Sequence, residues 1–360
     1  MPISRRELLG AGALAPVLSS CATNLSRFSD ELLPDLAARL GVCAASYVIL
    51  NAGKPNAPVA VSGCASATAM PPDAIFQAAS LTKPIIAFVA LQLVRDGKLD
   101  LRAPVSHYLP NGYAHRQNPF KNPNDKSQVD QVTAQTLVRI PVATLLNHSS
   151  GLPNWTRSAL SPEFTPGTRW QYSGEAYGLL QAVVGAVTEQ DIESVVRRHV
   201  FDPLNMPHSR LRLTEDIRKR AVAGTSWRGG VTQFDFNEPN AAASLYTTAE
   251  DYGNFIAGWL ADAPLLSLTV SNPIATVPEL GLSWGYGWGY GWGIETAAGG
   301  PYLWQWGNNP GFRAFAMISV SSGNGYVLLT NSERAMPLAA PLARSVVPAD
   351  HGVFRFSMLD

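Results

Sequence analysis

Apolar and polar positions alternate with a helical period over residues 76–94. Apolar side chains recur about every third or fourth position there, at Leu81, Ile85, Phe88, Leu91 and Leu93. A proline is tolerated only near the start of a helix, so Pro84 predicts that this helix begins close to Ser80. Backbone amides at such a start have no partners within the helix and attract negative charge.

Strand-like runs and turn residues occur on both sides of this helix. Residues 42–50 and 58–63 flank a turn at 51–56, which predicts a hairpin. Residues 111–133 are polar, contain prolines and lack a period, so we expect an extended surface loop there.

An aromatic and glycine repeat at residues 284–293 has the period of a strand. All five of its rings would then share one face. One interpretation is a platform on which sugars or aromatic acyl groups stack. The other is a sheet face buried against the core, the commoner fate of aromatic residues, with the glycines allowing close backbone approach.

Ser80 and Lys83 are three residues apart and therefore share one face of the predicted helix. Burial would lower the proton affinity of the lysine, and a neutral amine could then take the hydroxyl proton of the serine. This predicts a serine nucleophile beside its own base. The alternative is an ordinary N-cap serine and a solvated lysine, because so short a pattern occurs by chance in roughly every chain of this size.

Five further segments occur in an order that is typical of one family. They are residues 144–153 (TLLNHSSGLP), 166–174 (PGTRWQYSG), 201–206 (FDPLNM), 242–251 (AASLYTTAED) and 305–312 (QWGNNPGF). With Ser80 and Lys83, they make the chain resemble the serine β-lactamase-related hydrolases, the superfamily of penicillin-binding proteins, class C β-lactamases and their esterase relatives.

The resemblance implies a catalytic role for Tyr172. It falls where the family's second motif has a tyrosine, whose phenol works with the lysine in proton transfer. The alternative is a half-buried tyrosine that packs against Trp170. A core or turn role is expected for His148, which lies in a segment that resembles a structural part of the family.

The resemblance also identifies a third motif, Lys-Thr-Gly or His-x-Gly in the family, on a strand that lines the cleft. The corresponding residues, expected to contact substrate, are Gln305, Trp306 and Gly307. By this alignment the backbone N–H groups of Ser80 and Asn308 form the oxyanion hole, where the loss of one donor typically costs about a hundred- to a thousandfold in turnover.

Two departures from the family pattern concern the substrate. Gly174 stands at a substrate-binding position that is usually asparagine, so the amide that holds an acylamino group is missing; Glu175, Asn308 and Asn309 are candidates to replace it. Gln305 stands where many β-lactamases have a lysine, which removes a cation suited to a carboxylate. Efficient β-lactam hydrolysis is therefore disfavoured.

The resemblance implies an exported serine hydrolase that acts through an acyl-Ser80 intermediate on carboxylic esters or on envelope-derived acyl or D-aminoacyl substrates. Lys83 and Tyr172 would move the protons in both half-reactions. Alternatives are a D,D-peptidase or weak β-lactamase and, in another class, a non-catalytic cell-envelope binding module.

No metal or organic cofactor is expected. The six histidines show no metal-ligand spacing, and no Gly-x-Ser-x-Gly elbow occurs. The partner is a small-molecule or cell-envelope acyl substrate, with no nucleic acid.

The fold implied by the resemblance is α+β: an antiparallel sheet flanked by helices, with an inserted, mostly helical domain, as in β-lactamases and transpeptidases. Residues 25–95 and 283–360 would form the sheet domain and 96–282 the helical one. The active site would lie in the cleft between them, a common place for ligand pockets.

The first 24 residues have the features of an export signal. Ser4-Arg5-Arg6 resembles the start of a twin-arginine motif, and an apolar run follows that is too short to span a membrane. Cys21 then ends a sequence that resembles a bacterial lipoprotein processing site, which predicts a periplasmic or membrane-anchored lipoprotein that meets the membrane only through its lipid. The alternative is an ordinary cleaved signal with an incidental cysteine.

The remaining two cysteines, Cys43 and Cys64, lie at similar distances from the centre of the predicted hairpin turn. A disulfide between them suits an oxidising compartment. The alternative is two buried free thiols, which behave as small apolar residues.

Composition limits the classes of partner. The chain has 360 residues, zero formal net charge and 15% charged residues. It is long enough for a substantial core, and its neutral balance gives no attraction toward polyanions, so nucleic-acid binding is disfavoured.

Overall fold

The computed structural model describes most of the chain after the expected export signal. The described residues are 32–64, 70–71, 73–117, 120, 128–270, 273–285 and 290–359. The predicted signal and Cys21 therefore lie outside the described residues. Among the helices that are described, none combines the length and the apolar character needed to cross a bilayer.

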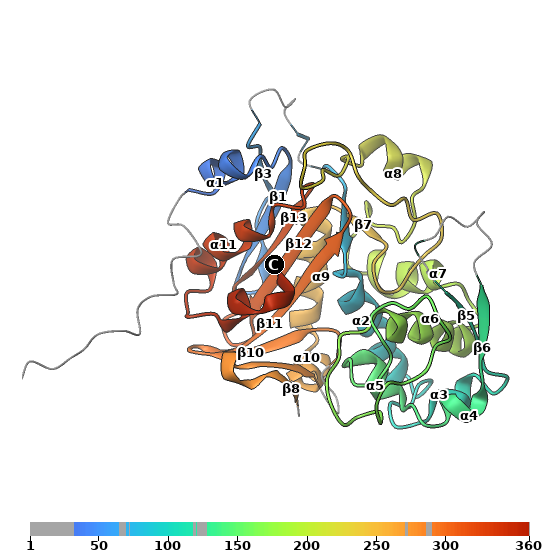
Figure 1. Cartoon of the computed structure of the whole chain (residues 1–360). Coiled ribbons are helices and arrows are strands. Elements are labelled where there is room, and N and C mark those ends of the chain that lie inside the picture. The colour runs from blue at the N-terminus through green and yellow to red at the C-terminus, as the bar shows by residue number, and fades with distance from the viewer. Residues whose placement is uncertain are drawn as a thin grey trace, which may run out of the picture.

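Helix α2 (Thr82–Arg95) is the helix predicted from the apolar period, and it begins just after Ser80. Most of its side chains are buried on every side, including Lys83. A helix of this kind lies inside a domain. Figure 1 shows α2 between the sheet and the helices α6 (Gly174–Thr188) and α7 (Ile192–Val196), both of which it contacts.

A nine-stranded antiparallel sheet forms the other half of the molecule. Its order is β2-β1-β13-β12-β11-β10-β9-β8, and β3 pairs with β1. The strands are β1 (Ala45–Asn51), β2 (Lys54–Pro55), β3 (Val59–Val61), β8 (Pro273–Val277), β9 (Leu282–Gly285), β10 (Gly293–Ala297), β11 (Gly300–Asn309), β12 (Phe312–Ser319) and β13 (Gly325–Thr330). The hairpin expected from residues 42–63 is present as β1, β2 and β3.

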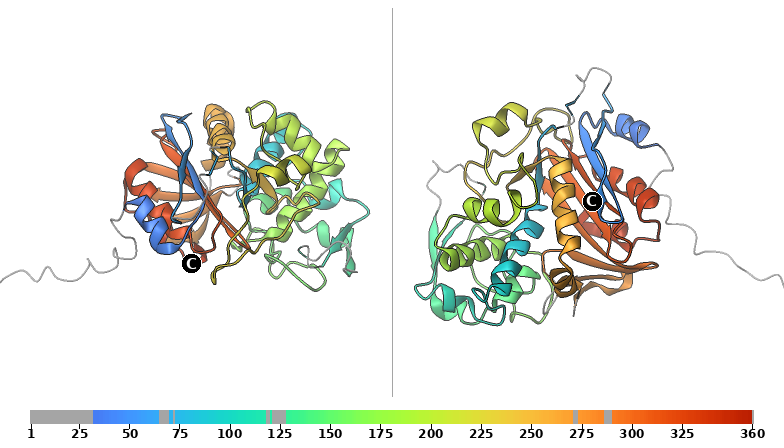
Figure 2. Two further views of the ribbon diagram at one scale, coloured as in Figure 1. Left: turned by 90° about the horizontal axis from the view of Figure 1, so that it is seen from above. Right: turned by 180° about the vertical axis from the view of Figure 1, so that it is seen from behind.

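Both faces of the sheet are buried. Along β12, Ala314 and Ala316 belong to the core shared with α2, whereas Phe315 and Met317 belong to a second core. This alternation is the two-residue period of a strand. The covering helices are α9 (Ala249–Ala261) on the first face, and α1 (Leu33–Leu40) and α11 (Ala339–Val346) on the opposite face (Figure 2).

The middle of the chain is largely helical. Besides α6 and α7 it contains α3 (Val105–Tyr108), α4 (Ala134–Leu137), α5 (Val142–Leu146), a π-helix (Arg197–Phe201), α8 (Glu215–Arg220) and α10 (Ala263–Val270). The predicted fold class, an antiparallel sheet with helices and a largely helical part, is confirmed. The sheet takes strands from residue 273 onward, earlier than the expected boundary at 283.

The prediction of an extended surface loop over residues 111–133 is wrong for the described residues at both ends of this range. β5 (Tyr113–Arg116) and β6 (Val129–Val132) pair there as antiparallel strands. The buried position on β5 is His115, which is held by carboxylates. The sequence did not indicate a strand here, because the buried position of β5 is a polar residue and the segment therefore shows no alternation of apolar and polar side chains.

The aromatic repeat is not one continuous strand, because β9 ends at Gly285 and β10 begins at Gly293. Tyr290 and Trp292 are fully buried, and the ring of Trp292 lies edge-on to that of Trp259 at 5.8 Å. For these two rings the interpretation as a face buried against the core is therefore confirmed. The other three rings lie outside the described side chains.

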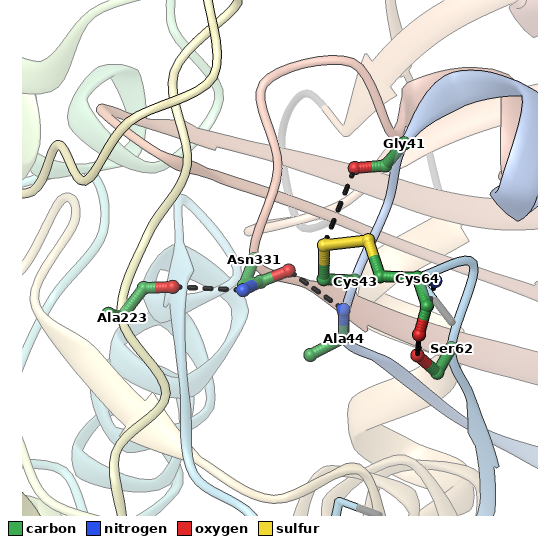
Figure 3. The surroundings of a disulfide bond; sticks show 7 residues. All are labelled: Gly41, Cys43, Ala44, Ser62, Cys64, Ala223 and Asn331. Carbon is green, nitrogen blue, oxygen red and sulfur yellow. Dashed lines mark hydrogen bonds between the residues drawn. A yellow bond between two sulfur atoms is a disulfide. The ribbon is translucent and has the colours of Figure 1, made fainter. Parts of the chain in front are cut away.

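A disulfide joins Cys43 and Cys64, as expected, with their Cα atoms 4.8 Å apart (Figure 3). It connects the residues that precede β1 to those that follow β3. Asn331 lies beside it and accepts a hydrogen bond from Ala44 N at 3.0 Å while donating to Ala223 O at 2.9 Å. This corner therefore fastens the start of the sheet to the end of β13.

The double variant Cys43→Ala/Cys64→Ala should lose about 3 kcal/mol of unfolding free energy, because the disulfide closes a loop with a sequence separation of 21. Equilibrium urea unfolding of the oxidised protein and of the variant measures the difference. Reduced wild-type protein should match the variant. Equal unfolding midpoints for all three would contradict a stabilising role for this bond.

Candidate active site

Strand β4 (Phe76–Ala79) delivers Ser80 to the start of α2. It pairs with β7 (Leu245–Thr247) and packs beside β11 and β12. At Ala79 the backbone enters the left-handed region, with φ +50°, which costs energy for any residue other than glycine. This turn ends the strand, and Lys83 N then donates to Ser80 O at 3.0 Å as the helix begins.

The Lys83 amine lies within hydrogen-bond distance of the Ser80 hydroxyl. The Nζ–Oγ distance is 3.0 Å, and Nζ also donates to the carbonyl oxygen of Ala242 at 2.8 Å. Lys83 is completely buried, and this burial holds its pKa well below the usual range of a lysine. The amine can therefore be neutral, and a neutral amine can accept the serine proton.

Tyr172 completes a compact group with Ser80 and Lys83. Its phenol hydrogen-bonds with the Ser80 side chain and accepts from Gln305 Nε2 at 3.3 Å, and Lys83 Nζ lies 4.8 Å from the ring centroid. Burial raises the pKa of Tyr172, an effect that these two hydrogen bonds reduce only in part. The phenol is therefore neutral, so it can donate or relay a proton rather than act as a standing phenolate.

His148 lies beneath Tyr172 in the core, with the two ring centroids 4.4 Å apart. Its Nδ1 accepts a hydrogen bond from Ser173 N at 3.1 Å. Burial, followed by the nearby Lys83 charge, keeps its pKa well below the usual range. The ring is thus a neutral packing surface that positions the tyrosine.

The third motif lies on β11, in the part of that strand that extends beyond its pairing with β10. β10 pairs with β11 only through Trp304, and the following residues pass beside β4 instead. A Cβ atom on Gly307 would lie 2.5 Å from Ala78 O and 3.1 Å from Ala79 Cβ. Only glycine allows β11 to approach β4 this closely. The approach brings Asn308 to the cavity that Ser80 also lines.

A cavity of about 350 Å³ opens over Ser80. The residues that line it are Ser80, Phe120, Asn154, Trp155, Tyr172, Ala243, Trp306, Asn308, Asn309, Ser357 and Met358. This set includes no lysine, arginine, aspartate or glutamate. The described wall is therefore aromatic and amide in character and carries no fixed charge.

Three residues predicted to contact substrate lie outside this lining. Gln305 is fully buried and points its amide at Tyr172 and at the Trp306 carbonyl oxygen, 3.0 Å away. Gly307 touches β4, and Gly174 begins α6 behind the indole of Trp155. Of the third motif, Trp306 and the predicted oxyanion residue Asn308 do line the cavity.

Glu175 cannot replace the missing asparagine, because its carboxylate is engaged away from the cavity. Oε2 lies 3.2 Å from His115 Nε2, and Oε1 accepts from Thr156 N at 3.0 Å. Asp130 lies on the other side of the ring, 2.7 Å from Nδ1. Burial alone would lower the pKa of His115, but its hydrogen bonds to Glu175 and Asp130 raise the pKa overall, which favours the protonated ring between these two carboxylates.

Sequence analysis missed the wall formed by Asn154 and Trp155. The family segment at residues 144–153 ends one position before this pair. Gly174 was interpreted only as the loss of a substrate-binding side-chain amide. The glycine also leaves room for another side chain, and the structure shows that this is the indole of Trp155. Among the described residues, no cluster of His, Cys, Asp and Glu side chains has the arrangement of a metal site.

Comparison with known proteins gives a family match over most of the chain. The family model described as Beta-lactamase matches residues 30–350. Protein flp of Staphylococcus aureus (strain MW2) is 27% identical over 196 residues, which are 51% of this chain and 38% of that protein. Esterase EstB of Burkholderia gladioli is 31% identical over 164 residues, 37% of this chain and 38% of that protein. Each match thus spans well under half of the relative.

Solved structures that are similar to this chain match most of its length. D-amino acid amidase from Ochrobactrum anthropi SV3 has a TM-score of 0.65 at 22% sequence identity, covering 87% of this chain and 97% of that one. At this identity the likeness shows the shared fold.

Gly307→Ala should slow the labelling of Ser80 by a fluorophosphonate about a hundredfold or more, because the added methyl group pushes β11 and the Asn308 amide away from β4. Intact-protein mass followed over time measures the rate. Gly185→Ala is the matched control, since its Cβ would meet only Gln190 O at 3.6 Å. Equal rates for both variants would show that the approach of β11 is not required.

The lowered pKa of Lys83 predicts a pH dependence of definite sign. Labelling of Ser80 should slow as the pH falls through this pKa, because the ammonium form cannot accept the serine proton. Lys83→Arg, which stays charged, should react slowly at every pH. A wild-type rate that does not change across the acid and neutral range would contradict the role of Lys83 as base.

Proposed function

This chain belongs to the beta-lactamase family, a family of serine hydrolases, and we propose that it cleaves carboxylic esters through an acyl-Ser80 intermediate. One observation carries the proposal: the buried amine of Lys83 lies 3.0 Å from the Ser80 hydroxyl oxygen. A protein that only bound a ligand would gain nothing from a lysine stripped of water at this position, because burial of its charge is costly.

Acylation begins with the Ser80 hydroxyl donating its hydrogen bond to the neutral Lys83 amine. Oγ attacks the carbonyl carbon of the ester, and the proton moves to Nζ. The Lys83 ammonium, held by Ala242 O at 2.8 Å, then returns the proton through the Tyr172 phenol to the leaving alcohol. Tyr172 suits this relay because burial keeps it neutral.

The oxyanion is stabilised by the backbone amides of Ser80 and Asn308. The Ser80 amide precedes α2, whose positive end faces the nucleophile. Deacylation repeats the sequence with water in place of the alcohol: Tyr172 and Lys83 take a proton from the water, the acid leaves, and Ser80 is protonated again. Each step balances without a metal or an organic cofactor.

The uncharged cavity wall supports a neutral acyl group as substrate. None of the described lining residues could pair with the carboxylate of a penicillin or of a D-Ala-D-Ala end, and the motif position at which many β-lactamases have a lysine is the neutral Gln305. Esterase EstB, one of the relatives by sequence, is named for ester cleavage. Cleavage of D-aminoacyl substrates is the second candidate, supported by the side-chain amides of Asn154 and Asn308 in the wall and by the shared fold with a D-amino acid amidase.

Export is part of the proposal. We propose that the protein acts in the periplasm or on a membrane through a lipid on Cys21, on small-molecule or envelope acyl substrates. The disulfide between Cys43 and Cys64 supports an oxidising compartment.

Intact-protein mass after exposure to a fluorophosphonate tests the serine hydrolase chemistry. Wild-type protein should gain one adduct, Ser80→Ala none, and Lys83→Ala and Tyr172→Phe should react about a hundredfold or more slowly. Lys98→Ala, an exposed lysine just after α2, is the matched control and should keep the wild-type rate. Folded wild-type protein without an adduct would instead favour the binding module.

Rates on p-nitrophenyl esters, D-aminoacyl esters and nitrocefin then separate the substrate classes. We expect the simple esters to be turned over fastest. A preference for nitrocefin would contradict the substrate assignment while leaving the acyl-Ser80 mechanism intact.

A further inference from the structure

We propose that Trp155 is a specificity-determining residue of the Ser80 site, where its indole and the ring of Phe120 form an aromatic wall that selects esters with an aromatic or similarly bulky apolar acyl group. This inference rests on the proposed ester hydrolysis and names the acyl class that the site prefers. Three features of the described residues carry it.

The first feature is the space in front of α6. A Cβ atom on Gly174 would lie 2.4 Å from both Cη2 and Cζ2 of Trp155. No real side chain tolerates such a contact, so any residue other than glycine at this position would displace the indole. The space that a side chain at position 174 would occupy is therefore filled by an aromatic ring.

The second feature is the rigidity of the segment that carries Trp155. On one side, Asn154 O accepts from Gly174 N at 3.0 Å and from Glu175 N at 3.1 Å, and Asn154 Oδ1 also accepts from Gly174 N at 3.0 Å. On the other side, Thr156 N donates to the Glu175 carboxylate at 3.0 Å. Glu175 is itself held by the buried His115. Both neighbours of Trp155 are thus tied to the start of α6, which fixes the backbone that carries the indole.

The third feature is an aromatic cluster that supports the wall from outside. The Phe120 ring meets the indole edge-on, with the ring centroids 4.5 Å apart. Its centroid also lies 5.7 Å from that of Phe234 and 6.2 Å from that of Phe236. Edge-to-face contacts of this kind hold rings in place. Trp155 remains only partly buried and lines the same cavity as Ser80.

The indole of Trp155 in this position would discriminate between substrates by the apolar area and the shape of their acyl groups. An acyl carbon bonded to Ser80 carries its substituent into a cavity of about 350 Å³, where an aromatic substituent gains contact with the indole that an acetyl methyl group cannot make. One hydrophobic contact of this size typically changes kcat/KM by about tenfold or more. The described wall has no charge to hold the carboxylate of a β-lactam, so the same geometry works against β-lactams.

The test compares kcat/KM for p-nitrophenyl phenylacetate with that for p-nitrophenyl acetate. We expect the ratio of the two to fall about tenfold or more in Trp155→Ala, and to stay nearer the wild-type value in Trp155→Phe, which keeps a ring. Trp227→Ala, whose indole is 55% exposed and does not line the cavity, is the matched control.

Gly174→Ala gives an independent variant that keeps Trp155 itself. The added methyl group should push the indole from its place and lower the same ratio. Gly178→Ala lies one turn later in α6, where a Cβ would meet only Tyr113 Oη at 3.6 Å, and should leave the ratio unchanged. If Trp155→Ala does not fold, the Gly174 and Gly178 pair decides the question alone.

The outcomes separate this inference from the proposed function. If the wild-type protein forms no fluorophosphonate adduct, the hydrolase assignment fails and the inference fails with it. If Ser80 is labelled and both esters are cleaved, but the ratio in Trp155→Ala and Gly174→Ala equals that of the controls, the hydrolase stands and the aromatic wall is overturned.

Discussion

The burial of Lys83 is the constraint on which the rest of the site depends. A lysine in water is charged and cannot take a proton from a serine. α2 is apolar on almost every side and lies between the sheet and the helical part, so its first turn places the amine where water is excluded. The cost of removing this charge from water is met by the large core around α2. The catalytic arrangement therefore requires both halves of the fold.

Close backbone packing joins the two sides of the site. Ser80 follows β4, Tyr172 precedes α6, and Asn308 lies near the end of β11. Gly307 lets β11 approach the carbonyl oxygen of Ala78, while the rings of His148 and Trp306 hold Tyr172 from two sides. None of these contacts is strong alone. Together they bring three residues from distant parts of the chain to the lining of one cavity.

The cavity wall shows how substrate choice separates from chemistry in this fold. Ser80 lies in the turn between β4 and α2, and Lys83, in the first turn of α2, and Tyr172, just before α6, are buried in the packed core. The wall at Asn154 and Trp155 lies on an irregular segment that is joined to the start of α6 by hydrogen bonds, and one of these is to Glu175, which His115 holds in place. A change in that segment alters the surface met by the acyl group without moving Lys83 or Ser80, in line with the usual placement of specificity on loops.

The α+β class, the helix after Ser80, a disulfide between Cys43 and Cys64 and the residue types of the reacting group could be predicted from the sequence, because helical period and ordered motifs can be read along the chain. It missed the β5–β6 hairpin, whose inward residue on β5 is the polar His115, and it misread the aromatic repeat as a single strand. The support of Tyr172 by Gln305 and the position of Trp155 beside Gly174 could be seen only in the folded chain, since contacts between segments far apart in sequence have no local period.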